Sequence, residues 1–296
     1  MSFSSETKAE LCREKLSHLE CVQAEAYGVL LFCNVYTPSE VRITTRSLDF
    51  AQRLPKLFHR AFEVTFDQMP EEQGGGAFVC TDREQIARMM DAFGANAESL
   101  LFHHINYGVL EERGTKAAFL RGAFLTGGSV TDPQKRYHLE LTTSHYYVHR
   151  ELQALLPELD FHPKETTRKS NYVTYFKQSE AIADVLTTIG APLAAMEIMN
   201  AKLEKHLRGS VNRRVNCDSA NLDKAVDAAL LQVEAIQRYS AIHGLDALPD
   251  KLRETARLRA ENPELTLAQL AALCDPPVTK SCLNHRLRKL MELAKE

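Results

Sequence analysis

The sequence predicts an α+β domain with an internal repeat, followed by an all-helical domain. Between about residues 21 and 192, the order helix, strand, helix, strand-like runs and helix occurs twice. Beyond that point only helical patterns remain. The 296 residues also exceed the usual size of one hydrophobic core. We therefore expect an N-terminal domain over residues 1–192, a basic helical linker over 193–220 and a C-terminal domain over 221–296.

The composition excludes several classes of protein. With a net charge of −3, the chain as a whole favours neither nucleic acid nor membrane, so any basic site has to be local. No apolar run approaches the roughly 18 residues of a membrane span, and the charged first turns lack the core of a signal peptide. The seven cysteines are odd in number and lack CxxC spacing. We expect a cytoplasmic protein without a disulfide framework, membrane contact, metal or cofactor.

The N-terminal domain is expected to begin with a short helix in residues 1–20. Ser4 or Ser5 would cap this helix, which runs to about Leu19. The first repeat, residues 21–100, predicts an apolar helix from Ala24, a strand over 41–47, a helix over 48–62, strands over 63–68 and 76–82, and a helix ending at Gly94. A loop over 69–75 joins the two later strands.

The second repeat, residues 117–192, has the same order. It predicts helices over 117–128, 144–159 and 179–191, a strand over 137–143, and strand-like runs over 161–166 and 171–177. Three anchor pairs support the duplication: Gly28 with Gly122, Thr44-Thr45 with Thr142-Thr143, and Phe93-Gly94-Ala95 with Ile189-Gly190-Ala191. Their offsets of 94, 98 and 96 residues are nearly constant, as expected for a duplicated unit.

Two histidines in the second repeat have the spacing of metal ligands. His145 and His149 are four residues apart in SHYYVHRE, which puts both on one helix face. No third ligand is evident, so we interpret them as part of a solvated helix face.

The C-terminal region predicts a series of helices. Residues 201–216 hold five Lys or Arg, among which Arg213 and Arg214 are candidates for phosphate contacts. An ordinary charged linker helix is an equal alternative. Ser219 is expected to cap a new helix that stops at Gly244. Three more helices follow, separated by Asn262-Pro263 and by Asp275-Pro276-Pro277.

The last two helices are a candidate helix-turn-helix that reads DNA. Thr266 caps a short helix, and after the DPPV turn Thr279 caps the final helix. The side opposite the apolar stripe of the final helix is polar and basic, as base and phosphate contacts require. The candidate DNA-binding residues are Thr266, Gln269, Thr279, Lys280, Ser281, Asn284, His285, Arg286, Arg288 and Lys289. The alternative is a helical hairpin with a solvated basic face.

Three long segments carry a resemblance to a known family. RGAFLTGGSVTDPQKRYHLEL (121–141), LRGSVNRRVNCDSANLDKAVDAAL (207–230) and DPPVTKSCLNHRLRKL (275–290) resemble the bacterial WhiA family, in the family's order. The resemblance covers nearly the whole chain. It implies a LAGLIDADG homing endonuclease-like domain with a pseudo-two-fold repeat, followed by a helix-turn-helix similar to region 4 of sigma factors. It also implies DNA-binding regulators of sporulation in some Gram-positive bacteria, and of cell division and chromosome segregation in others.

The resemblance can be followed residue by residue. In LAGLIDADG nucleases, two motif helices pack through small residues, and each delivers a metal-binding carboxylate at its end. Overlaying LRGAFLTGGS on the motif puts Gly122 at the packing position and Gly127 at the acid position. In the first repeat, AYGVLLFCNV puts Gly28 and Cys33 there. Neither Gly127 nor Cys33 offers the oxygen ligand that magnesium prefers, so the resemblance implies a scaffold without cutting chemistry.

The leading hypothesis is a non-enzymatic, sequence-specific transcriptional regulator that binds double-stranded DNA at the nucleoid as a monomer. The first alternative is a metal-dependent endonuclease, in which Asp132 would have to replace a lost ligand. The second is a protein-docking or sensor role of the N-terminal domain, acting with a sigma factor or another regulator. The predicted strands mix basic residues with acidic ones, which argues against a strong DNA footprint on the sheets.

Overall fold

The computed structural model describes residues 2–70, 75–94 and 103–295. The chain divides into two compact units, Met1–Lys205 and His206–Glu296. The first unit combines helices with two sheets, and the second is helical. In the described part of the chain, no helix combines the length and the apolar character needed to cross a membrane.

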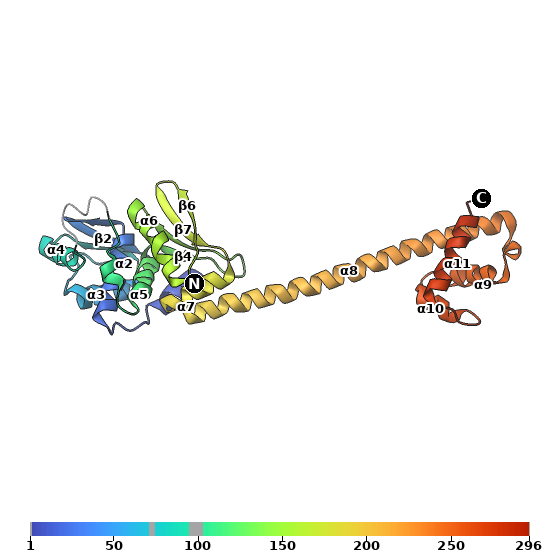
Figure 1. Ribbon diagram of the computed structural model, residues 1–296, viewed down its shortest axis with the longest axis horizontal. Helices are drawn as coiled ribbons and strands as arrows, with labels where there is room; N and C mark the ends of the chain where they lie inside the picture. The colour runs from blue at the N-terminus through green and yellow to red at the C-terminus, as the bar shows by residue number, and fades with distance from the viewer. Residues whose placement is uncertain (1, 71–74, 95–102, 296) are drawn as a thin grey trace. The chain divides into compact units, whose positions relative to one another are not determined.

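The first unit consists of two halves with a similar order of helices and strands, of which the second has one more strand. Figure 1 labels their elements. Helix α1 (Phe3–Leu11) precedes the two halves. The first half contains α2 (Leu19–Phe32), β1 (Val35–Thr37), β2 (Glu40–Thr45), α3 (Leu48–Phe62), β3 (Gly76–Cys80) and α4 (Arg83–Asp91). The second contains α5 (Thr115–Gly127), β4 (Gly128–Val130), β5 (Leu139–Thr143), α6 (Tyr146–Leu155), β6 (Lys164–Arg168), β7 (Asn171–Phe176) and α7 (Ser179–Ile189). The predicted α+β fold is confirmed.

Each half has its own antiparallel sheet. The strand orders are β1-β2-β3 and β4-β5-β7-β6. Buried and more exposed residues alternate along β2 and β5, as expected for strands with one face on the core. Val41 pairs with Cys80 in the first sheet, and Leu141 pairs with Thr174 in the second.

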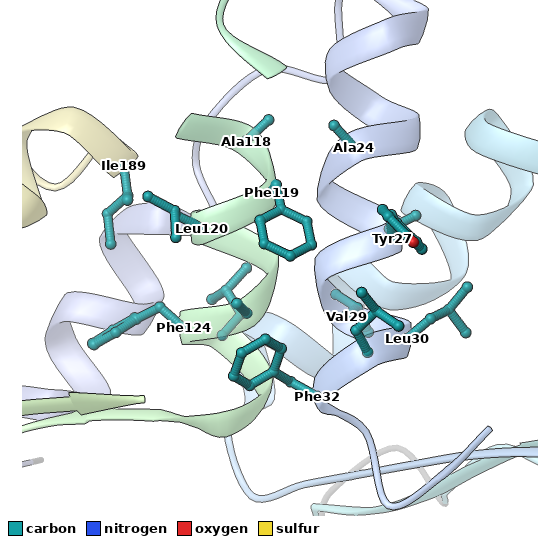
Figure 2. Packing of buried hydrophobic residues seen from close by; sticks show 14 of the residues in the cluster. Ala24, Tyr27, Val29, Leu30, Phe32, Ala118, Phe119, Leu120, Phe124 and Ile189 are labelled. Carbon is teal, nitrogen blue, oxygen red and sulfur yellow. The ribbon is translucent and has the colours of Figure 1, made fainter. Parts of the chain in front are cut away.

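Helices α2 and α5 pack directly against each other in the core of this unit (Figure 2). A glycine of each helix lies against the backbone of the other. A Cβ atom on Gly28 would lie 2.9 Å from the backbone nitrogen of Ala123, and one on Gly122 would lie 3.0 Å from that of Val29. Each would also collide with a carbonyl oxygen of the facing helix. Both positions therefore require glycine, because only glycine allows this close approach.

A buried carboxylate ties three helices together beside this contact. Glu25 of α2 is 1% exposed. Its two carboxylate oxygens accept hydrogen bonds from Arg53 Nε and Nη2 of α3 at 2.7 and 2.9 Å, and one also accepts from Arg121 Nε of α5 at 2.9 Å. Burial alone would lower the pKa of Arg53, but the hydrogen bonds and charge of Glu25 raise it. A buried charge is stable only when paired in this way.

The anchor pairs of the repeat occupy equivalent places in the two halves. Thr45 and Thr143 end β2 and β5, and each hydroxyl accepts a hydrogen bond from the backbone N–H two residues later. Gly94 and Gly190 follow α4 and α7 with φ values of 62° and 103°. These left-handed conformations favour glycine and end each helix. The predicted Ala95 partner of Ala191 lies outside the described residues.

The predicted first helix and one predicted strand of the first half are wrong. The first helix is capped by Ser2 and ends at Leu11, well before Leu19. Beyond it, Arg53 Nη1 donates hydrogen bonds to the carbonyl oxygens of Cys12 and Glu14 at 3.0 and 2.6 Å. In a longer helix these carbonyls would instead accept hydrogen bonds from the backbone of the next turn. The segment 63–68 is not a strand, since its one β-bridge joins Gln68 to Val79 of β3. Its first residue, Glu63, still belongs to the end of α3, where it has a left-handed conformation.

The interpretation of His149 as solvated is also wrong. This histidine is 4% exposed, and its ring nitrogens lie 3.1 Å from Glu165 Oε2 and 3.1 Å from Thr174 Oγ1. His145 lies just before α6, and its ring packs on that of His103 at a centroid distance of 4.1 Å. The two histidines therefore have separate neighbours and do not converge on one ligand.

Helix α8 (Pro192–His243) is continuous through the predicted linker. Ser219 is therefore not a helix cap, which corrects the prediction. An exposed serine costs a helix interior only a few tenths of a kcal/mol, and no proline interrupts the segment. Gly244, with φ of 74°, ends the helix as predicted.

The second unit packs three shorter helices against the end of α8. These are α9 (Asp250–Glu261), α10 (Leu267–Leu273) and α11 (Lys280–Leu293). Their core consists of Ile236, Leu248, Leu252, Ala256, Leu270, Ala271, Cys274, Leu283, Leu287 and Leu290. The apolar stripe predicted for the last helix is therefore buried.

Candidate nucleic-acid interface

The two positions that would carry nuclease carboxylates lie at the ends of α2 and α5. A Cβ atom on Gly127 would lie 2.5 Å from the carbonyl oxygen of Thr142 and 2.9 Å from Phe32 Cδ1. This position has no room even for a methyl group. The thiol of Cys33 is buried and donates to the carbonyl of Val35 at 3.1 Å. Burial raises its pKa to about 12, so the thiolate that binds metal is not populated near neutral pH.

The first acid after Gly127 in the sequence, Asp132, stabilises its own turn. Asp132 Oδ1 accepts a hydrogen bond from the backbone N–H of Gln134 at 2.8 Å, and its carbonyl accepts from Lys135. Among the residues that the structure describes, no group of three His, Cys, Asp or Glu side chains is placed to hold a metal ion. Asp132 therefore belongs to its turn and to no such group among the described residues.

Several charged side chains on the two sheets are paired within the protein. Arg42 forms an ion pair with Glu40 at 2.5 Å. Arg168 lies 3.3 Å from Glu140, which also contacts His138 at 2.9 Å. These contacts occupy basic groups that a phosphate backbone would otherwise attract, so the sheets present mixed charge.

The α10–turn–α11 segment has the geometry of a helix-turn-helix. Thr266 and Gln269 form a reciprocal capping box at the start of α10. The turn is closed by a hydrogen bond from the backbone N–H of Val278 to the carbonyl of Ala271 at 3.0 Å. Thr279 then caps α11, because its hydroxyl accepts from the backbone N–H of Cys282 at 3.2 Å. Both predicted caps are confirmed.

The outer face of α11 is exposed, polar and basic. Leu283, Leu287 and Leu290 point into the core and are each at most 2% exposed. The exposed side chains on the other side are Lys280, Ser281, Asn284, His285, Arg288 and Lys289. The first acid along the helix is Glu292. Short polar groups near the N-terminus and cations further along are what a recognition helix presents to bases and phosphates.

Arg286 is placed differently from its predicted neighbours. Its side chain is only 14% exposed, and Nη1 lies 3.6 Å from Glu254 Oε2 of α9. Glu254 Oε1 also accepts from the backbone N–H of Asp275 in the turn at 2.7 Å. Arg286 therefore helps to hold α11 in place rather than pointing outward. Helical spacing is the signal for this role, since Arg286 is three residues after Leu283 and four before Leu290.

The remaining candidates are exposed at other places. Arg213 and Arg214 lie on α8 and are exposed. Thr266 and Gln269 are also exposed, but their side chains bond to each other in the capping box. Sequence reasoning missed Glu254 and Arg259. The Nη1 of buried Arg259 donates to the carbonyl of Leu265 at 2.8 Å, which anchors the segment before α10.

Family models match both regions of the chain. The model described as the WhiA LAGLIDADG-like domain matches residues 116–208, and that described as the WhiA C-terminal HTH domain matches residues 211–294. A probable cell division protein WhiA of Alkaliphilus metalliredigens is 35% identical, over 99% of this chain and 98% of the relative. Another, of Lysinibacillus sphaericus, is 38% identical over 99% and 96%.

Solved structures share the fold. The crystal structure of full-length DUF199/WhiA from Thermatoga maritima has a TM-score of 0.61 at 23% identity, covering 100% of this chain and 98% of that one. The N-terminal LAGLIDADG domain of DUF199/WhiA has a TM-score of 0.51 at 19% identity, covering 64% and 90%. Fold and site thus define a protein that joins a LAGLIDADG-like domain to a C-terminal helix-turn-helix domain. The relatives narrow this class further: the chain belongs to the WhiA family.

Proposed function

We infer that this protein is a sequence-specific DNA-binding regulator whose reader is the outer face of α11. The observation that carries the proposal is the set of exposed polar side chains on a capped helix whose opposite side is locked into the core. Ser281, Asn284 and His285 would meet base edges in the major groove. Arg288 and Lys289 would add base or phosphate contacts, and Lys280 a phosphate contact.

The test uses duplexes selected by the purified protein from a random-sequence library. Arg288→Ala or His285→Ala should weaken binding to the selected site by about 1–3 kcal/mol, or roughly 5- to 150-fold in Kd, and relax the preference at one base pair. Arg257→Ala is the matched control, because this exposed arginine lies on α9. Unchanged affinity for both α11 variants would show that the assigned face is not the reader.

The phosphate contact can be separated from base reading by salt. Lys280→Ala should weaken binding to all sequences alike and reduce the slope of log Kd against log salt by about one. Gel-shift titrations at several salt concentrations measure this slope. A loss confined to the selected sequence would assign Lys280 to base reading instead.

We further propose that the protein does not hydrolyse DNA. The crowded position of Gly127 and the buried thiol of Cys33 support this proposal, because neither supplies an oxygen ligand for a metal. Supercoiled plasmid incubated with the protein and magnesium or manganese should stay intact. Nicking by the purified protein that Asp132→Ala abolishes would contradict the proposal and assign the metal to that carboxylate.

The biological process follows from the relatives. They are named as probable cell division proteins, which supports a role of this chain in cell division. We propose that it acts at the nucleoid by regulating transcription of genes for division and chromosome segregation. A genome-wide map of its binding sites, compared with transcript levels after deletion of its gene, tests this. Binding sites without changes in neighbouring transcripts would contradict transcriptional regulation.

A further inference from the structure

Helix α8 carries a row of exposed apolar side chains within the second unit. We call the α8 stripe the five residues Leu207, Val211, Val215, Leu222 and Val226. Each of them is between 50% and 64% exposed. A row of this kind is unusual on a soluble protein, where large exposed apolar side chains normally occur singly. The stripe therefore marks an interaction surface.

The spacing of the α8 stripe keeps it on one side of a straight helix. Its steps are four, four, seven and four residues, and the seven-residue step skips one turn at Asp218. Steps of four, four and three make an 11-residue repeat, which matches the pitch of a nearly straight α-helix. From Leu207 to Val226 the stripe is about 28 Å long, at about 1.5 Å per residue.

The charge along this part of α8 changes sign near its middle. Residues 206–215 contain Arg208, Arg213 and Arg214 and no carboxylate. Residues 216–227 contain Asp218, Asp223 and Asp227 with one lysine, Lys224. The stripe is also symmetric about this region: Leu207 and Val226 lie equally far from the midpoint between residues 216 and 217, and so do Val211 and Leu222. An antiparallel copy of this helix would therefore meet Leu207, Val211, Leu222 and Val226 with apolar residues, place the central Val215 beside Asp218 of the copy, and bring segments of opposite charge together.

We propose that the α8 stripe binds a second copy of this chain, with the two α8 helices antiparallel. Leu207 then faces the partner's Val226, and Val211 faces the partner's Leu222. Arg214 lies beside the partner's Asp218, and the two-fold axis repeats this ion pair. A parallel pair is disfavoured, because it would set the basic residues 206–215 of the two helices beside each other, and likewise the acidic residues 216–227. This proposal differs from the monomer expected from the sequence.

A groove beside the stripe supports the same occupant. Leu222 and Val226 form one wall of an apolar groove of about 500 Å³, which Pro263, Leu265 and Leu267 line on the other side. In the antiparallel pair, the partner's Leu207 and the partner's Val211 would lie at this groove. Thr266 and Lys280 also line this groove, and Lys280 is a proposed phosphate contact. The dimer is therefore tested without DNA, so that its failure leaves the proposed reading of bases by Ser281, Asn284 and His285 untouched.

Sedimentation velocity of the full chain without DNA tests the dimer. The fraction of dimer should rise with protein concentration. Val211→Asp should leave a monomer at every concentration, with an unchanged helical circular dichroism spectrum. Leu231→Asp is the matched control: it is 56% exposed on the opposite side of α8 and should still dimerise. A wild-type protein that stays monomeric, or an equal response of the two variants, overturns the proposal.

Single cysteines test the antiparallel register. In a full chain whose exposed Cys217 and Cys282 are changed to serine, Leu207→Cys and Val226→Cys are prepared separately. Neither variant alone should form a disulfide-linked dimer under mild oxidation, because equal positions lie at opposite ends. The mixture of the two should crosslink. Crosslinking of each variant alone, or none in the mixture, overturns the register.

Discussion

Gly127 at the end of α5 occupies the position of a nuclease carboxylate, and its crowded surroundings predict what happens when the acid is restored. Gly127→Asp restores the residue type that a LAGLIDADG nuclease would have. It also adds a Cβ atom 2.5 Å from the carbonyl oxygen of Thr142 and 2.9 Å from Phe32. Thr142 cannot easily retreat, because its strand pairs with β7, and the Phe32 ring is buried. We therefore expect destabilisation instead of a working metal site.

The magnitude follows from the crowding. Overpacking a filled site costs about 1–3 kcal/mol. For a unit of about 200 residues, each kcal/mol lowers the melting temperature by about 2–4 °C, so a drop of about 2–12 °C is expected. Calorimetry with and without magnesium measures it. Gly127→Ala should show most of the loss, since it adds the same Cβ atom without charge. An unchanged melting temperature for Gly127→Asp, or a rise with magnesium, would refute the reasoning.

Three further changes test the structure. Glu25→Gln should lower the free energy of unfolding by about 3–5 kcal/mol in urea titrations, because it leaves the buried Arg53 and the partly buried Arg121 without their counter-charge. Unchanged stability would mean that the cluster is solvated. Burial and the neighbouring His145 lower the pKa of His103 from 6.5 to about 4. Between pH 6.5 and pH 4 this histidine is protonated in the unfolded chain but not in the folded one, so folding stability should fall as the pH drops through this range. His103→Asn should reduce the slope of stability against pH there, and an unaltered slope would contradict the reasoning. Thr266→Ala should lower the free energy of unfolding by about 1 kcal/mol, because it removes the capping box of α10. Urea unfolding measures this change, and an unchanged free energy would show that the cap does not stabilise the protein.

Local chemistry explains which elements the sequence predicted well. Gly94 and Gly190 mark helix ends because the chain becomes left-handed there, a conformation that glycine adopts most easily. Thr266 and Thr279 were recognisable as caps because a hydroxyl before an apolar helical pattern has a fixed role. These signals need only a few neighbouring residues.

Long-range partners explain what the sequence did not reveal. Glu25 is stable inside an apolar helix only because Arg53 and Arg121 reach it from positions 28 and 96 residues later. The same Arg53 decides where α1 stops, through carbonyls that no local pattern identifies. The sequence predicted Arg286 as a DNA-binding residue, whereas in the structure it forms an ion pair with Glu254 of α9. In each case, the deciding residue lies on another element.

Burial of α2 on all sides has a consequence for synthesis of the chain. Every residue from Ala24 to Phe32 is buried, so this helix has no face suited to water. Its partner α5 begins only at Thr115, 83 residues after Phe32 (115 − 32). At about 5–20 residues per second, a ribosome needs about 4–17 s to add that length. During this time α2 lacks the helix that covers it in the folded protein. The two halves of the repeat therefore become stable together, after the second half has been synthesised.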